Sequence, residues 1–504
     1  MRRLFLLLLA FAMTISLQAK EHPCLLHTRK GVAEMKSSQG EVPLFDCSFK
    51  ELKELADGAI GTPIVVPIPK DAGGGYTHEQ HKNNYLSMWN AGVAYQVTGK
   101  KEYAAYVHKM LMEYAKMYPT LGCHPDKKSG TTGKIFWQTL NDCVWLVHTS
   151  VAYDCVYDYI GEADRKVLEK DLFMPMAEFI SNGNKPNLDV FNKMHNHGTW
   201  ATAAVGMIGY VMDSKDLTEK ALRGFSKDGK GGFLLQLEEL FSPDGYYTEG
   251  PYYLRYAIWP FLMFAQSIQN NEPDVKVFER NDAILIKAAN AEFQMMYNNI
   301  VLPLNDALYK DIHTNELVYA VDIAYANAPK ESRELLSIAK EQDRVIICDA
   351  GFKTAKAAAD SQAQPFIGKP MLFRDGREGD QGAISILRYG QNPDQTCLVM
   401  KATSHGLSHG HYDKLSFSFY DNGATILQDY GAVRFLNIEP KYGGHYTVEN
   451  NTFGKQTIGH NTLVVDQTSH FRGDIKESGK CWPEQLFFDV QPNIQITSAR
   501  EVNA

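Results

Sequence analysis

The spacing of apolar residues changes along this chain from a helical period to strand alternation, and that change limits the fold to two unlike parts. From about residue 79 to 297 the apolar positions follow a helical i, i+3, i+4, i+7 spacing. Helices are expected at residues 85–97, 101–117, 137–159, 163–180, 198–212, 217–226, 233–241, 252–268 and 281–296. Successive helices without intervening strands favour a helical solenoid or toroid. Because no repeat of fixed period is present, an irregular α domain is the alternative.

After about residue 343 the apolar residues alternate with polar ones. Residues 415–420 alternate in this way, and Asp421, Asn422 and Gly423 then form a turn before residues 424–427, which indicates a β-hairpin. Further strands are expected at residues 383–388, 396–401, 461–465 and 485–490, with another starting at 494–497. This pattern predicts an antiparallel sheet or sandwich. With 504 residues, 44% of them apolar, the chain is long enough for two or three domains.

The first nineteen residues have the composition of a signal peptide. Arg2 and Arg3 precede an apolar run at residues 4–15, and Ala19 offers a small residue for cleavage. We therefore expect a mature chain that begins at Lys20 and is periplasmic or secreted. The apolar run is too short to span a bilayer, and no later run of about 18 apolar residues occurs, so no membrane span is expected.

Charge and cysteine content narrow the class of protein further. The net charge of -8 is spread without a basic stripe, which gives no footprint for nucleic acid. The aromatic content of 11%, with 26 tyrosines, suits contact with carbohydrate, although core packing explains any single ring equally well. None of the eight cysteines has the spacing of a zinc ribbon or redox motif, so we expect structural thiols with one disulfide, of unassigned connectivity.

Two short segments concentrate polar groups in otherwise apolar surroundings: residues 192–200 (NKMHNHGTW) and residues 408–417 (SHGHYDKLSF). Buried imidazoles, amides and carboxylates must be paired, bound to a ligand or used in chemistry. A helix beginning near Pro251 would place Tyr252, Arg255 and Tyr256 on one face, with Tyr253 turned by about 100° from Tyr252. Chemistry that needs both segments would be assembled between the two parts of the fold.

The second segment also suggests a metal site. His409, His411 and Asp413 precede the strand at 415, Asp429 ends the next strand, and His460 follows later. One aspartate and two histidines from neighbouring strands suit zinc, which accepts imidazole nitrogen and carboxylate oxygen at about 2.0–2.2 Å. Spacing alone does not decide which carboxylate would take part.

These segments, together with residues 428–431 (QDYG) and 459–462 (GHNT), resemble the heparinase II/III-like lyases and most resemble the alginate lyases of polysaccharide lyase family 17. The resemblance extends over about residues 20–500. It implies an α+β multidomain protein, with an N-terminal α/α toroid at residues 20–335, a C-terminal antiparallel β-sandwich at 336–504 and a substrate cleft between them. Family members usually continue further, so we expect either a fragment or a shortened, incomplete sandwich.

The resemblance also implies a reaction, β-elimination on a uronic acid, and roles for individual residues. Asn196 and His197 would neutralise the uronate carboxylate, with Tyr446 as base and Tyr253 as acid, although one phenol could serve both steps. His409 would lie beside the cleaved bond. The implied substrate-binding residues are Gln138, Arg255 and Arg434, and the implied ligands of a structural Zn²⁺ are His411, Asp429 and His460.

The expected partner is an anionic uronic-acid polysaccharide or oligosaccharide, cleaved from its end. Scarce Lys/Arg clusters favour an unsulfated chain such as alginate over the heparin or heparan-type glycosaminoglycans that the same fold also cleaves. A non-catalytic surface carbohydrate-binding protein and a metal-dependent hydrolase are the other interpretations. The sequence does not decide between mannuronate and guluronate or between endolytic and exolytic action. It also leaves open whether the protein is a monomer or a homodimer.

Overall fold

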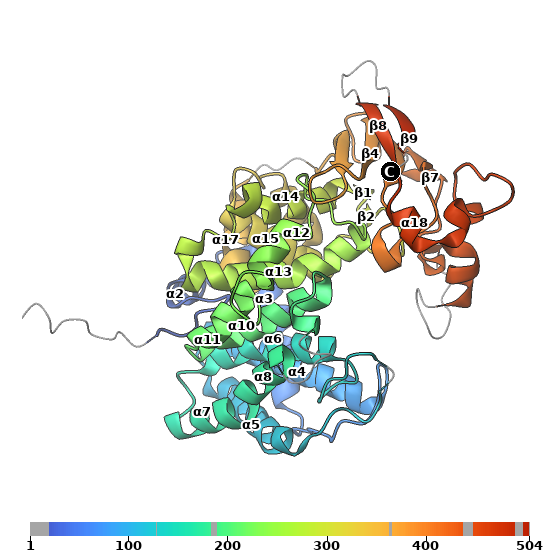
Figure 1. Ribbon diagram of the computed structural model, residues 1–504. Helices are drawn as coiled ribbons and strands as arrows, with labels where there is room; N and C mark the ends of the chain where they lie inside the picture. Colours follow the sequence, from blue (N-terminus) through green and yellow to red (C-terminus); the bar gives the residue numbers. More distant parts are fainter. Residues whose placement is uncertain are drawn as a thin grey trace, which may run out of the picture.

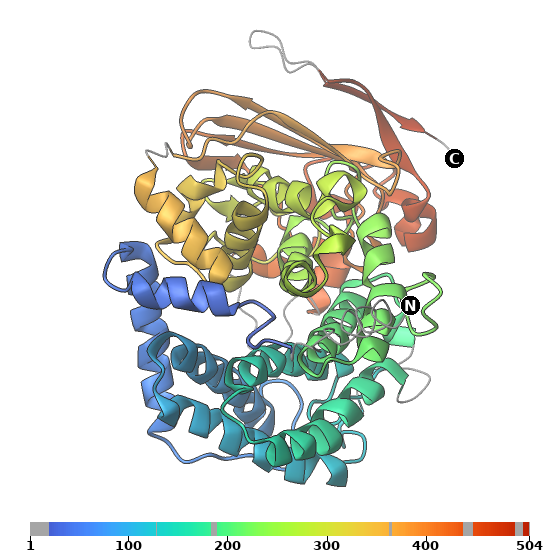
Figure 2. The same ribbon diagram turned by 90° about the vertical axis from the view of Figure 1, so that its left-hand side faces the viewer.

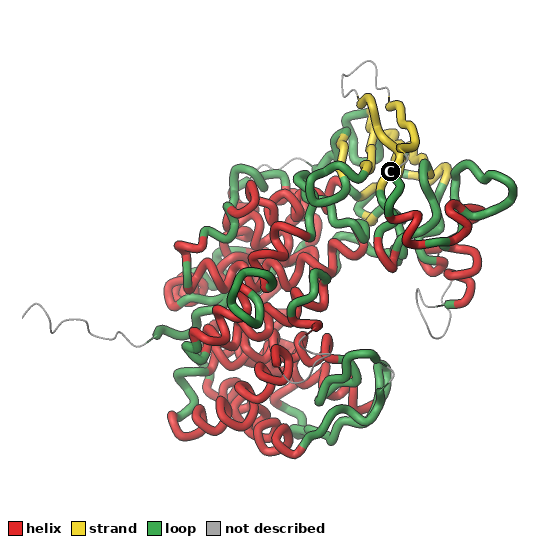
Figure 3. Tube along the Cα trace, in the orientation of Figure 1, coloured by secondary structure: helices red, strands yellow, loops and turns green. Residues whose placement is uncertain are grey.

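The structure, a computed structural model, describes residues 20–127, 129–182, 189–361, 365–436, 447–488 and 497–502. Its N-terminal part is helical and its C-terminal part is built around an antiparallel sheet (Figure 1, Figure 3), which confirms the α+β class. The helices of the first part are α2 (Arg29–Ser37), α3 (Pro43–Ile60), α4 (Tyr76–Thr98), α5 (Lys101–Met117), α6 (Thr139–Val156), α7 (Glu162–Leu168), α8 (Met174–Asn182), α10 (Asn196–Val211), α11 (Lys215–Arg223), α12 (Gly232–Glu239), α13 (Pro251–Asn271), α14 (Arg280–Gln294), α15 (Asn315–Asn327), α16 (Leu335–Gln342) and α17 (Asp349–Asp360).

The helices form a ring. Helices α4, α6, α10, α13 and α15 contact one another in that order and make its inner layer, with the other helices packed outside them. Helix α17 contacts both α2 and α3, so the end of the helical part returns to its beginning. Figure 2 shows this arc, in which the gold end of the helical part lies beside the blue start of the chain. The predicted toroid is therefore confirmed over the irregular α domain.

The sequence of each helix explains its layer. Nearly every side chain of α6 is buried, as expected of a helix that is apolar on all sides. Helix α10 has the same character. Helix α5 instead buries one stripe that includes Tyr103, Val107 and Tyr114, and it lies in the outer layer. The periodicity of the sequence thus separates inner from outer helices.

One predicted helix is divided in the structure, and the helices run past the predicted domain boundary. The helix expected at residues 163–180 is divided into α7, a π-helical stretch at Glu169–Phe173, and α8. Pro175 provides the reason, because proline cannot donate a backbone hydrogen bond and its ring displaces the carbonyl four residues earlier. The helical part also continues to Asp360 rather than to residue 335, since α16 and α17 pack on α15 and complete the ring.

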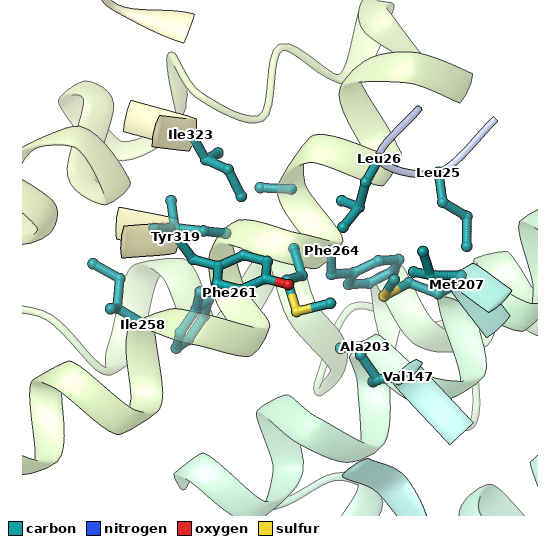
Figure 4. Packing of buried hydrophobic residues seen from close by; sticks show 14 of the residues in the cluster. Leu25, Leu26, Val147, Ala203, Met207, Ile258, Phe261, Phe264, Tyr319 and Ile323 are labelled. Carbon is teal, nitrogen blue, oxygen red and sulfur yellow. The ribbon is translucent and has the colours of Figure 1, made fainter. Parts of the chain in front are cut away.

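The core of the ring includes the N-terminal segment of the described chain. Leu25 and Leu26 are fully buried and lie in one cluster with Met207 and Phe264 from α10 and α13 (Figure 4). The Asp154 carboxylate on α6 accepts hydrogen bonds from the backbone N–H groups of Cys24 and Leu25, at 2.7 and 2.8 Å. This buried acceptor fixes the segment against the inner helices.

The expected disulfide does not form, since none of the eight cysteines, each within the described residues, is bonded to another. Six of them are buried, two of these on α6, where they pack as small apolar side chains. Burial raises the pKa of the Cys143 thiol well above its ordinary value, so this thiol stays protonated. Among the described helices, none is both long enough and apolar enough to cross a membrane.

The C-terminal part has a five-stranded antiparallel sheet in the order β3-β4-β5-β6-β7. Asn422 and Gly423 both have positive φ in the β6–β7 turn, as a tight two-residue hairpin requires, so the predicted hairpin is confirmed. The β8–β9 hairpin contacts β4 and β5 from outside this sheet and begins a second layer (Figure 1). The strands are β3 (Met371–Arg374), β4 (Gly382–Tyr389), β5 (Thr396–Thr403), β6 (Ser416–Asp421), β7 (Ala424–Leu427), β8 (Trp482–Phe488) and β9 (Thr497–Val502).

The strand expected at residues 461–465 was wrong. This segment has no strand ladder, and only Val465 forms an isolated bridge, with Thr468. Instead, the Asn461 side-chain amide donates to the carbonyl oxygens of Phe417 and Gln428 and thereby fastens the segment to the β6–β7 hairpin. The residue types of this segment favour a strand, but the contact of the Asn461 side chain holds it in a different conformation.

Ring and sheet are joined by charged and polar contacts. Arg374 on β3 binds both oxygens of Asp244, a loop residue of the ring, at 2.7 Å each. The buried Arg388 guanidinium on β4 donates to the backbone carbonyls of Gln294 and Met296 at the end of α14. The two parallel bonds of Arg374 fix orientation as well as distance, and Arg388 adds a buried contact through one nitrogen, so together they set how the sheet lies on the helical ring.

Replacing His148 on α6 with Phe tests how the free energy of unfolding depends on pH through this buried imidazole. Burial lowers the pKa of His148 from 6.5 to about 4, so between these values the unfolded chain binds a proton that the folded chain does not. Acid therefore favours unfolding of the wild type through this residue. Relative to the wild type, His148→Phe should gain about 2 kcal/mol in free energy of unfolding between pH 7 and 4.5, measured by urea denaturation. An unchanged difference between the two proteins would contradict this.

Candidate active site at the ring–sheet junction

Two helix starts bring the first group of candidate residues to the junction. Asn196 begins α10, and the His195 Nδ1 that precedes it accepts a hydrogen bond from the His197 backbone N–H at 3.2 Å. The turn before α10 needs Gly198, because a Cβ there would lie 2.1 Å from the Lys193 carbonyl oxygen. Helix α13 begins with a proline, which places Tyr253 in its first turn.

Tyr253 meets the C-terminal part directly. Its ring stacks on the imidazole of His409, with centroids 3.9 Å apart and planes inclined by 19°. Tyr253 lies on α13 of the helical ring, whereas His409 ends a 3-10 turn, Leu407–His409, between β5 and β6. The stacking thus brings α13 against the second polar segment, residues 408–417, and the first segment lies near enough that the charge of His409 contributes to the lowered pKa of His197.

The Asp306 carboxylate lies at the centre of this junction and is 1% exposed. Its oxygens contact His409 Nδ1 and His411 Nε2, both at 3.0 Å. They also accept from the Asn450 amide and the Lys455 ammonium, both at 2.8 Å. Burial would raise the pKa of Asp306, but the hydrogen bonds from the two histidines and the charge of Lys455 outweigh it and hold the pKa well below its ordinary value. Asp306 is therefore an anion that holds four groups at once.

Two imidazoles of the α10 segment remain neutral at neutral pH. Burial lowers the pKa of His195 to about 3 and that of His197 to about 4, and the nearby Lys193 adds to both shifts. A neutral imidazole donates one hydrogen bond through its single N–H, so His197 can contact an anion without bringing a full charge. The Asn196 side-chain oxygen is buried and has no hydrogen-bond partner among the described residues.

Glu249 is a further buried carboxyl group that the sequence did not single out. It is 1% exposed, and one of its oxygens lies 3.8 Å from His195 Nε2 and 3.9 Å from His409 Nε2. Burial raises its pKa above the ordinary value. Glu249 precedes α13 by two residues, so it reaches the junction from the same turn that places Tyr253.

His411 and His460 direct one nitrogen each into a shared space. His411 Nδ1 and His460 Nε2 are buried without a partner among the described residues, and with the Asp413 carboxylate they lie within 4.8 Å of one another. Each histidine uses its other nitrogen on a carboxylate, His411 on Asp306 at 3.0 Å and His460 on Asp429 at 2.7 Å. A carboxylate on the outer nitrogen is the usual support of a metal-binding histidine, so these residues fit a divalent cation.

The side chains that face the shared space include Asp413, whereas the implied ligand Asp429 contacts the other nitrogen of His460. His411 and Asp413 are two residues apart in a segment without helix, which lets both face one side. The buried Lys401 ammonium binds both oxygens of Asp413 at 2.7 Å and keeps that carboxylate in place.

The remaining candidate residues lie in different surroundings. Arg255 is 4% exposed and forms an ion pair with Glu316 at 2.5 Å, with its guanidinium over the Tyr252 ring. The expected shared face of Tyr252 and Arg255 is confirmed, but Arg255 is already paired within the protein. Gln138 directly precedes α6 and is half-buried. Tyr446 and the side chain of Arg434 lie outside the described residues.

Both parts of the chain match known protein families. The sequence profile of the alginate lyases matches residues 49–300, and that of the heparinase II/III-like C-terminal domain matches residues 373–501. The chain is 47% identical over 492 residues to an exo-oligoalginate lyase of Saccharophagus degradans and 48% identical over 437 residues to an alginate lyase of Stenotrophomonas maltophilia. These alignments cover 97% and 86% of this chain but 66% and 58% of the relatives, so the chain spans about two thirds of their length or less.

A solved structure supports the fold. The heparan sulfate lyase from Pedobacter heparinus aligns with 93% of this chain and 68% of its own, with a TM-score of 0.58 and 14% sequence identity. At this identity the likeness concerns the arrangement of ring and sheet. The same arrangement accommodates sequences that share few residues.

Replacing Asp306 with Asn tests the central contact of the junction. The substitution keeps the shape but removes the charge that pairs with Lys455 and binds two imidazoles. Because the loss leaves buried donors without their anion, the free energy of unfolding should fall by roughly 3–5 kcal/mol in urea denaturation. Asp380→Asn, at an exposed loop position, is the control and should change it by less than about 0.5 kcal/mol. Equal effects of the two substitutions would contradict the role of Asp306.

Proposed function

The chain belongs to the alginate lyase family, and on this premise we propose that it is a polysaccharide lyase that cleaves alginate or oligoalginate by β-elimination. The observation that carries the proposal is the stacking of Tyr253 from the helical ring on His409 from the C-terminal part, with His197 near enough for the charge of His409 to lower its pKa. The relatives named exo-oligoalginate lyase and alginate lyase support the same activity for this chain, and the first of these names supports exolytic cleavage.

The neutral polar groups near Tyr253 suit the first demand of the reaction. Removing the C5 proton of a uronate transfers charge onto its carboxylate, which must be stabilised by donors placed in advance. In this proposal the amide of Asn196 and the neutral imidazole of His197 donate to that carboxylate. Their burial strengthens such hydrogen bonds, because few water molecules compete for the donors.

The second demand is proton transfer at C5 and at the leaving O4. In the proposed mechanism Tyr253 protonates the departing oxygen, and Tyr446, whose role rests on the family resemblance, takes the C5 proton. The stacked His409 holds the Tyr253 ring in place and lies beside the cleaved bond. Asp306 in turn holds His409 through Nδ1, so the position of the phenol depends on contacts from both parts of the protein.

We further propose that His411, Asp413 and His460 hold a structural Zn²⁺. The support is the pair of unpartnered buried nitrogens, the adjacent carboxylate, and the outer carboxylates of Asp306 and Asp429. Bound zinc would fasten the segments that carry these residues. The elimination itself consumes no water, so this account needs no metal-activated water and does not favour the hydrolase interpretation.

The charges near the junction support an unsulfated substrate. Two of the described cations there are neutralised within the protein, Lys455 by Asp306 and Arg255 by Glu316. The charge of Lys193 is exposed to solvent. A heavily sulfated glycosaminoglycan would call for more free positive charge. The proposal therefore prefers alginate to heparin-type chains, and it places the protein in the periplasm or outside the cell, as the composition of residues 1–19 predicts.

Tyr253→Phe tests the lyase proposal. Removing the phenol oxygen should lower kcat on alginate by about 10²–10⁴-fold, because the proton donor is lost while the ring still stacks on His409. Formation of the unsaturated product, followed by ultraviolet absorbance, gives the rate, and circular dichroism confirms folding. Tyr389→Phe, at an exposed tyrosine, is the control and should keep full activity. If Tyr253→Phe were equally active, or if the wild type cleaved no uronate polymer, the proposal would fail and a non-catalytic binding protein would be favoured.

Metal analysis tests the zinc proposal. The purified protein should contain about one zinc per chain, and chelation should lower its Tm, because the metal fastens segments of the C-terminal part. Asp413→Ala should abolish stoichiometric zinc, whereas Asp429→Ala should weaken zinc binding by about 10–100-fold, as loss of an outer carboxylate does. Retention of zinc by Asp413→Ala, together with its loss from Asp429→Ala, would reverse the proposed roles of the two carboxylates.

A further inference from the structure

Four aromatic side chains from four inner helices form a closed circuit within the ring. Trp89 on α4, His148 on α6, Trp259 on α13 and Tyr319 on α15 make up what we call the aromatic box. Neighbouring ring centroids are 5.3 Å apart for Trp89 and His148, 5.5 Å for His148 and Trp259, 5.6 Å for Trp259 and Tyr319, and 6.4 Å for Tyr319 and Trp89. All four rings line one cavity of about 310 Å³.

The aromatic box is distinct from the reaction site proposed above. Trp259 follows Tyr253 by six residues on α13, which places it about 9 Å further along the helix axis. The fully buried Trp200 ring lies 5.4 Å from Trp259 and 5.8 Å from Tyr256, so packed rings occupy the space near the intervening turn of α13. The cavity is also lined by Leu55 and Leu86, which are 63% and 44% exposed, so it reaches the surface beside α3 and α4.

The polar groups of the cavity suit a sugar acid. Arg344, Asn90 and Asn315 line it together with the aromatic box. Arg344 donates through one nitrogen to the His313 carbonyl at 3.0 Å and to Asn315 at 2.7 Å, and a guanidinium has further N–H groups that can bind a carboxylate. Trp259 Nε1 is buried and has no partner among the described residues. These groups offer donors to a carboxylate and to hydroxyls around an aromatic floor.

The charges of the cavity favour this ligand over a cation. Circuits of aromatic rings can bind quaternary ammonium groups through cation–π attraction. Here Arg344 places a fixed positive charge at the cavity, which opposes a cation and attracts a carboxylate. Glu51, also on the lining, is exposed and therefore well screened. A cavity of about 310 Å³ is at the small end of ligand sites, which limits the occupant to one or two sugar rings.

We propose that the aromatic box is a second saccharide site, which binds a uronate of one or two rings by stacking on its tryptophans and by a carboxylate contact to Arg344. The proposal takes only the chemical class of its ligand from the proposed function. The site is reached beside α3 and α4, away from the Tyr253 and His409 pair. A bound sugar would contact α4 and α15, the first and last helices of the inner layer.

Titration calorimetry on the full chain with mannuronate and guluronate monosaccharides and disaccharides tests this site. The wild type should bind one of them, with quenching of tryptophan fluorescence. Arg344→Ala should weaken that binding at least tenfold through loss of the carboxylate contact, and Leu86→Trp should weaken it by filling the mouth of the cavity. Leu86 is 44% exposed and Arg344 is half-buried, so both variants should fold and keep kcat on alginate within about twofold.

Mannose and choline are the control ligands. Mannose lacks the carboxylate and should bind at least tenfold more weakly than the uronate, and choline should not bind. Uronate affinity that is unchanged in both variants, or binding of choline in place of uronate, would overturn the proposal. Because the titration needs no turnover, it is independent of the lyase proposal. Uronate binding that depends on Arg344 in a protein without lyase activity would refute the proposed function alone.

Discussion

One buried carboxylate holds the two parts of this protein in a common arrangement. Asp306 belongs to a loop of the ring, yet its partners His409, His411, Asn450 and Lys455 all belong to the C-terminal part. An anion in such a place is stable only while its donors surround it, and the donors are correctly placed only while the anion is present. The stacking of His409 on Tyr253 and the direction of His411 Nδ1 both depend on this arrangement. The contact therefore couples the candidate active site to the candidate metal site.

The architecture follows from periodicity and was largely predictable. The helical stripes separate inner from outer helices, and the turn at Asn422 and Gly423 gives the β6–β7 hairpin. Predictions failed where a single contact outweighed local preference. Pro175 introduces a π-helical stretch, and the Asn461 side chain fastens to the hairpin a segment whose composition is that of a strand. Such contacts depend on the tertiary structure and leave little trace in the local pattern.

The candidate site was predictable in its residue types but not in its pairings. The family resemblance implies that Asn196, His197, Tyr253 and His409 act together, and the structure brings Tyr253 and His409 into contact. Asp306 gave no such signal, because it is an isolated loop carboxylate 103 residues before His409. Spacing could not show either that Asp413 lies with His411 and His460 while Asp429 contacts the outer nitrogen of His460, since this depends on how the His460 ring is turned. Pairings of this kind are set by the fold and so require coordinates.

The central claim is that Asp306 acts on the reaction by placing His409 against Tyr253. A double-mutant cycle on kcat/KM for alginate, with Asp306→Asn, Tyr253→Phe and the double variant, measures this coupling directly. The account predicts strong non-additivity, with the double variant scarcely less active than Tyr253→Phe alone, because the carboxylate has little left to position once the phenol oxygen is gone. Effects that multiply independently would contradict it and would show that Asp306 and Tyr253 act apart.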